Sequence, residues 1–94
     1  MYIIVLTYIK PVDEIDKYLD QHQKYLEKYY HDNKFIVSGR RKPRIGGVIV
    51  CHKMDKEELK QIILEDPFHI HQIATYDIIE FEPTRHAHGF EQFM

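Results

Sequence analysis

The chain has 94 residues, close to the usual size of one domain, and no stretch rich in glycine, serine or proline divides it, so we expect one domain over residues 1–94. Hydrophobic residues make up 44% and charged residues 30% of the sequence, which is enough apolar surface for a core and excludes a disordered chain. The 13 basic and 15 acidic side chains leave a net charge of −2, so no overall field attracts nucleic acid or an anionic membrane, and we expect neither as a partner.

The first segment, residues 2–9, predicts a β-strand because it is rich in β-branched and aromatic residues and is followed by Pro11. It has no basic leader and no small-residue cleavage site, and it is far shorter than the roughly 20 residues that span a bilayer. We therefore expect a cytoplasmic protein.

The segment after Pro11 predicts one long amphipathic helix that ends near Asn33. Charged and amide side chains separate larger side chains that recur at spacings of three and four. These positions are Ile15, Tyr18, Leu19, His22, Leu26, Tyr29 and Tyr30.

A β-hairpin is expected next, with strands at residues 35–38 and 47–52. The loop between them holds Pro43 and four basic residues, so the hairpin has a basic tip. Cys51 is the only cysteine and lies in an apolar run. No intramolecular disulfide is possible, and we expect a buried, inert thiol.

The second helix is expected from Asp55 to about residue 65. Asp55 followed by Glu58 matches the pattern of an N-terminal capping box. One apolar face is formed by Leu59, Ile62 and Ile63. Pro67 disfavours helical geometry at Asp66, so the helix should end there.

Residues 68–72 are expected to be irregular and to lead into a last strand at residues 73–82. The resulting order, β-α-β-β-α-β, is that of a ferredoxin-like α+β fold with an antiparallel sheet and two helices on one face. Residues 2–6 and 47–51 are apolar at nearly every position, which is typical of strands buried on both faces. Because two helices cover one face, we expect the other to pack on a second copy, giving a homodimer of the α+β-barrel kind.

His22 and Asp66 are the candidate catalytic residues. The His22 ring lies within the apolar stripe of the first helix and needs a partner; the alternative is a core histidine bonded to a carbonyl or a tyrosine hydroxyl. Asp66 continues the inward face of the second helix at its negative end, which disfavours a carboxylate unless a cation or several donors compensate. Here the alternative is an Asp-Pro turn that ends the helix.

Both helices lie on the same side of the expected sheet, so these two side chains could meet. An imidazole oriented by a carboxylate is a competent general base near neutral pH, because the carboxylate fixes the tautomer and stabilises the imidazolium.

Four short segments together resemble the YCII-related family: residues 22–26, Ser38-Gly39, Gly46-Gly47 and Asp66-Pro67-Phe68. The resemblance extends over residues 1–83 and leaves residues 84–94 as a C-terminal tail. It implies a ferredoxin-like dimer with a cleft that contains His22 and Asp66 as its acid/base pair. Ser38, Gly39 and Phe68 are then expected to contact a substrate. One branch of the family dehydrochlorinates hydroxylated aromatics, which implies acid/base chemistry on a small molecule.

The basic loop, residues 40–44, is more charged than the loop typical of that family. Arg40, Arg41 or Arg44 could bind an anionic substrate, since guanidinium groups bind carboxylates and phosphates in a bidentate manner. Arg40 is our candidate for this substrate contact. The alternative is a solvated hairpin tip.

Two histidine pairs, His69 with His71 and His86 with His88, have a spacing that places both rings on one side of an extended chain. Ordinary loop and tail histidines are favoured because no Cys or Glu follows at a recognisable spacing. We expect no metal and no cofactor. In the tail, Phe90 and Phe93 should pack on the body or on a dimer partner.

The favoured hypothesis is a small-molecule enzyme of the lyase or hydrolase kind, with His22 as general base or acid and Asp66 as its orienting partner. A non-catalytic ligand-binding or interaction module of the same fold, with a structural His–Asp pair, is the alternative. No motif specifies the substrate.

Overall fold

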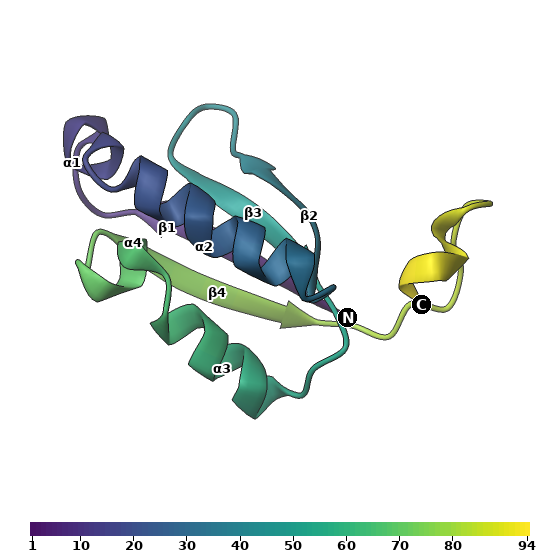
Figure 1. Cartoon of the computed structure of the whole chain (residues 1–94). Helices are drawn as coiled ribbons and strands as arrows, with labels where there is room; N and C mark the ends of the chain where they lie inside the picture. The colour runs from purple at the N-terminus through teal and green to yellow at the C-terminus, as the bar shows by residue number, and fades with distance from the viewer.

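The computed structural model describes residues 1–94 and shows a four-stranded antiparallel sheet with helices packed against it (Figure 1). The strands are β1 (Tyr2–Tyr8), β2 (Phe35–Arg40), β3 (Gly46–Cys51) and β4 (Ala74–Glu80). Their order in the sheet is β2-β3-β1-β4, and every neighbouring pair is antiparallel. The predicted α+β, ferredoxin-like fold is confirmed.

The helices are α1 (Val12–Asp16), α2 (Leu19–His31), α3 (Lys56–Leu64), α4 (Pro67–Ile70) and the short 3-10 helix η1 (Phe90–Phe93). No helix is both long enough and apolar enough to cross a membrane. At α3, the Asp55 carboxylate accepts a hydrogen bond from the backbone N–H of Glu58, so the predicted cap is confirmed.

The prediction of one long first helix is wrong, because the chain turns between α1 and α2. The backbone N–H of Tyr18 bonds to the carbonyl of Ile15, three residues back, which tightens the chain at this point. The Tyr18 ring stacks on His71, with ring centroids 3.8 Å apart. Hydrophobic periodicity contains no signal for such a contact between distant residues.

The prediction of an irregular segment at residues 68–72 is also wrong, since α4 begins at Pro67 and extends to Ile70. The Asp66 carboxylate accepts a hydrogen bond from the Phe68 N–H at 3.0 Å and so caps the N-terminus of α4. Asp66 therefore faces the positive end of α4 rather than serving as the last residue of α3. Pro67 explains both helix boundaries, because proline disfavours a helical residue before it and suits the first position of a new helix.

The hydrophobic core lies between the sheet and the helices and forms one cluster of 16 buried residues. In β1, alternate residues point into it, as the period of a strand requires. Tyr25 of α2 is part of this core although the predicted stripe omits it. Cys51 is buried as predicted, and burial raises the pKa of its thiol to about 11.

A β-bulge in β2 changes which side of the sheet its residues face. Phe35 pairs with Cys51, but the next paired residue is Val37, opposite Val50, so the alternation shifts by one residue. Consequently Phe35 and Ser38 both face α2, and the Ser38 hydroxyl is hydrogen-bonded to the Tyr30 hydroxyl.

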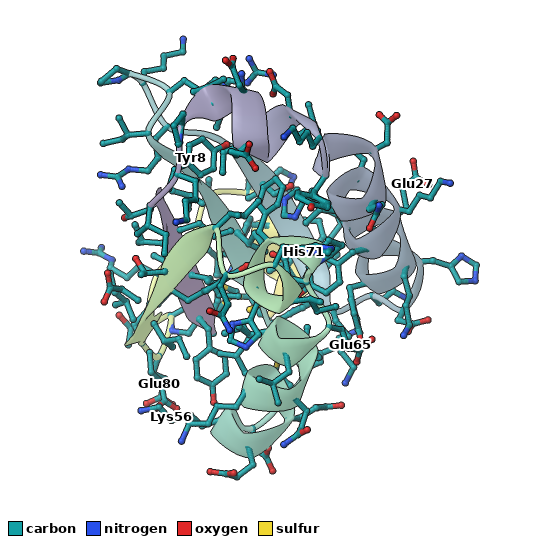
Figure 2. The ribbon with its side chains drawn as sticks, turned by 90° about the vertical axis from the view of Figure 1, so that its left-hand side faces the viewer. Tyr8, Glu27, Lys56, Glu65, His71 and Glu80 are labelled. Carbon is teal, nitrogen blue, oxygen red and sulfur yellow. The ribbon has the colours of Figure 1, made fainter.

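The second face of the sheet carries no helix, and apart from Asp77, opposite Val5, its central residues are apolar. Figure 2 shows the helices gathered on one side of the strands. On the opposite side, register places Val37, Val50, Ile3 and Ile79 in one row across all four strands. Val37 is 55% exposed and Ile79 is 51% exposed, so the expectation that both faces are buried does not hold within a single chain.

Candidate active site

The side chain of His22, on α2, contacts the side chain of Asp66, at the start of α4, in the interior of the molecule. The His22 Nδ1 lies 2.7 Å from the Asp66 Oδ1, and the Asp66 residue is fully buried. His22 itself is only 8% exposed. Its partner is therefore a carboxylate, rather than the carbonyl or tyrosine hydroxyl that a simple core histidine would use.

Three donors surround the Asp66 carboxylate. Oδ1 accepts from the His22 ring and from the Phe68 N–H, and Oδ2 accepts from the Tyr76 hydroxyl at 2.7 Å. These bonds give the buried Asp66 oxygens the partners that a buried polar group needs. The sequence analysis expected several hydrogen-bond donors around a buried Asp66, and the structure contains them.

Tyr76 is the residue of this site that sequence reasoning missed. It lies on β4 between Ala74 and Ile78, and these alternate residues face the helices. Burial, and then the negative charge of Asp66, raise the pKa of Tyr76, so its hydroxyl keeps its proton and donates. Alternation could have placed Tyr76 on the inner face, but only the strand register brings it to Asp66.

The partner of His22 determines which ring nitrogen is available for chemistry. When the Asp66 carboxylate accepts a hydrogen bond from Nδ1–H, the lone pair of the neutral imidazole lies on Nε2. Nε2 makes no hydrogen bond within the chain. The ring stacks on Phe68, with centroids 4.0 Å apart and planes 6° apart, which holds its orientation.

A cavity of about 210 Å³ lies beside the His22 ring. His22 lines it, whereas Asp66 lies behind the imidazole and does not. The four predicted substrate-binding residues also line it: Ser38, Gly39, Arg40 and Phe68. All four residues line the same cavity as His22, and their contact with a substrate stays a prediction.

The three arginines of the basic loop occupy different places. Arg40 and Arg44 line the cavity. Arg41 does not, because its guanidinium donates to the Thr7 hydroxyl at 3.0 Å. Arg44 also pairs through Nη2 with the Asp16 carboxylate, at 2.6 Å.

The pair His69 and His71 does not form the arrangement considered for a metal. His69 lies in α4 rather than in an extended chain, and its ring packs edge-on against Tyr76, while His71 stacks on Tyr18. No three or more His, Cys, Asp or Glu side chains are grouped so that they could hold a metal ion.

In the tail, the Phe93 ring packs near His52, and the His52 Nδ1 bonds to the Phe93 carbonyl at 2.8 Å. The tail therefore touches the body of the molecule at its C-terminal end. Figure 1 shows the rest of it extending beyond β4.

The model of the YCII-related domain matches residues 1–82 of the sequence. The chain belongs to the YCII-related family. No curated protein matches the sequence. Among solved structures, this YCII-related chain is similar to 5-chloro-2-hydroxyhydroquinone dehydrochlorinase (TftG) from Burkholderia phenoliruptrix AC1100, in complex with 2,5-dihydroxybenzoquinone. The TM-score is 0.73 at 16% identity, and the match covers 87% of this chain and 94% of that one. At that identity the likeness shows a shared fold.

Proposed function

We propose that this YCII-related protein is a small-molecule enzyme in which His22 transfers a proton and Asp66 positions it. The observation that carries the proposal is the 2.7 Å bond between Nδ1 and Asp66, made beside a cavity and leaving Nε2 free. Support of a general kind comes from the similar fold of a dehydrochlorinase whose structure holds a dihydroxybenzoquinone.

The reaction is of the lyase or hydrolase kind. In a lyase, Nε2 takes a proton from the ligand, the electron pair of the broken bond forms a double bond, and the leaving group departs with its own pair. In a hydrolase, Nε2 takes a proton from water as the water oxygen bonds to the ligand. The bond to the leaving group then breaks with its electron pair on that group, which takes the proton from the imidazolium. In both, the Asp66 carboxylate stabilises the imidazolium that forms. Ser38, Gly39, Arg40 and Phe68 are the proposed ligand contacts.

A second function of the same site is non-catalytic ligand binding. It is favoured by the position of Asp66, which joins α2, α4 and β4 through hydrogen bonds to His22, Phe68 and Tyr76. A buried carboxylate bonded in this way also serves as a structural link, whether or not the ligand reacts.

The substitution His22→Asn separates the two functions, because the asparagine amide nitrogen takes the place of Nδ1 as a donor to Asp66 but cannot take up a proton. We expect a folded variant that loses turnover by about 10²- to 10⁴-fold in a screen of hydroxyaromatic and carboxylic small molecules. The matched control is His86→Asn, at an exposed histidine of the tail. Equal turnover in His22→Asn and the parent would contradict the catalytic proposal. A parent that binds these compounds without converting them would favour the second function.

We also propose that the protein is a homodimer formed through the open face of the sheet. The row of Val37, Val50, Ile3 and Ile79 is a continuous apolar strip on the side without helices. A chain of this size buries only about 60–65% of the surface that its unfolded form exposes, so association adds stability. The same face of a second copy provides a matching apolar surface.

A further inference from the structure

The Arg44 guanidinium contains a donor that the protein does not use. Its Nη2 is paired with Asp16, but its Nε is buried and has no hydrogen-bond partner in the chain. Buried polar groups in folded proteins are nearly always bonded, so the guanidinium of Arg44, a side chain that lines the cavity, has unused capacity to donate to a ligand.

The cavity is also positively charged. Of the 15 residues that line it, Arg40 and Arg44 are cationic and none is an aspartate or a glutamate. This contrasts with the chain as a whole, whose net charge is −2. Asp16 pairs with Arg44 but does not line the cavity itself.

The remaining walls are suited to an apolar ligand body with a polar end. Leu6, Leu26, Ile49 and Phe68 are buried side chains that line the cavity, and they lie on the sheet, α2 and α4. His22 shares these walls with the two arginines, so a ligand bound by the arginines lies in the same space as Nε2.

We propose that the ligand of this cavity carries an anionic oxygen group, a carboxylate or a phenolate, which the Arg44 guanidinium and Arg40 bind while an apolar ring or chain packs toward His22 and Phe68. Guanidinium bonds to such oxygens are charge-assisted and strong. That the protein converts this anion rests on the proposed function, whereas binding of the anion does not depend on it.

The same arginines would assist the proton transfer. When Nε2 removes a proton from a ligand, the electron pair left behind adds negative charge to that ligand. Fixed cationic donors in a partly enclosed cavity stabilise such a charge without having to reorganise. The substrate class expected is therefore a small anion that becomes more negative as it reacts.

Calorimetric titration of the full chain with benzoate and with benzamide, its neutral counterpart, tests the charge preference. We expect benzoate to bind at least about 10-fold more tightly than benzamide, and inorganic phosphate to report whether a ring-free anion is sufficient. Equal affinity for benzoate and benzamide, or no binding of either anion, would overturn the proposal.

Arg44→Gln should weaken benzoate binding by about 10- to 100-fold, the range for one charge-assisted bond. Arg41→Gln removes the same charge from the same loop but outside the cavity, so it should leave affinity within about 2-fold. Asp16→Asn removes the charge beside Arg44 and should leave binding equal or tighter. Circular dichroism checks that each variant is folded. A loss in Arg41→Gln as large as in Arg44→Gln would show that only the overall loop charge matters.

Binding and turnover in the parent protein together keep this inference separate from the proposed function. Anion binding without turnover would support this inference and contradict the proposed enzyme activity. Turnover of neutral ligands alone would support the enzyme activity and contradict this inference.

Discussion

Asp66 is fully buried, and its carboxyl oxygens are bonded by three donors, from His22, Phe68 and Tyr76. Removing a partner from a buried polar group exposes the full desolvation penalty of that group, whereas the bond itself adds little net stability. Each donor to Asp66 is therefore important for two reasons: it stabilises the fold, and it sets how firmly the carboxylate holds the His22 ring.

Tyr76→Phe removes one donor from Asp66 without changing the shape of the core. We expect unfolding free energy to fall by about 1–3 kcal/mol. We also expect kcat to fall while KM is unchanged, because Tyr76 does not line the cavity. NMR of the His22 ring nitrogens should show a less uniform Nδ1–H tautomer.

Tyr25→Phe is the matched control for Tyr76→Phe, since it also removes one buried hydroxyl. The Tyr25 hydroxyl donates to the backbone carbonyl of Ile62 at 2.9 Å, not to Asp66. This variant should lose stability but keep its kcat and its His22 spectrum. Unchanged kcat in Tyr76→Phe would limit Tyr76 to a structural role.

The start of β3 depends on the residue type at one position, Gly46. Gly46 begins β3, opposite Thr7, and lines the cavity. A β-carbon at Gly46 would lie 1.8 Å from the Leu6 carbonyl oxygen, far inside any real contact. The β1–β3 pairing at this point exists only because residue 46 has no side chain.

Gly46→Ala should therefore destabilise the fold by more than about 3 kcal/mol, beyond the usual range for overpacking, because the clash is with backbone. Gly39→Ala is the matched control: nothing lies within 4 Å of its added carbon, and its stability should change by less than about 1 kcal/mol. Urea unfolding of both variants measures the difference. A stable Gly46→Ala protein would mean that β1 and β3 can separate here at little cost.

At the scale of the whole molecule, the open apolar face is the main feature that a single chain leaves unexplained. Val37 and Ile79 lie at opposite edges of the sheet and are each more than half exposed. Charging them would not disturb the core of one chain, but it would place two carboxylates inside the proposed dimer contact.

Val37→Glu combined with Ile79→Glu should convert the dimer to a monomer, as measured by size-exclusion chromatography with light scattering. Leu64→Glu is the control, because Leu64 is 50% exposed on α3, away from the open face. It should stay dimeric. A monomeric parent, or a double variant that still dimerises, would contradict the proposed interface.

Local sequence determined the order of the strands and main helices along the chain. It also determined the helix cap at Asp55 and the inward positions of His22 and Asp66. These follow from side-chain period, capping chemistry and the restriction that Pro67 imposes on its neighbour, all of which act within a few residues. Only the tertiary structure decided the rest. The meeting of Tyr76 with Asp66, the bulge that turns Ser38 inward, and the difference between Arg41 and Arg44 all depend on strand register. The register that brings Tyr76 to Asp66 joins strands far apart in the sequence, with Leu6 opposite Tyr76, which is beyond the reach of any local pattern.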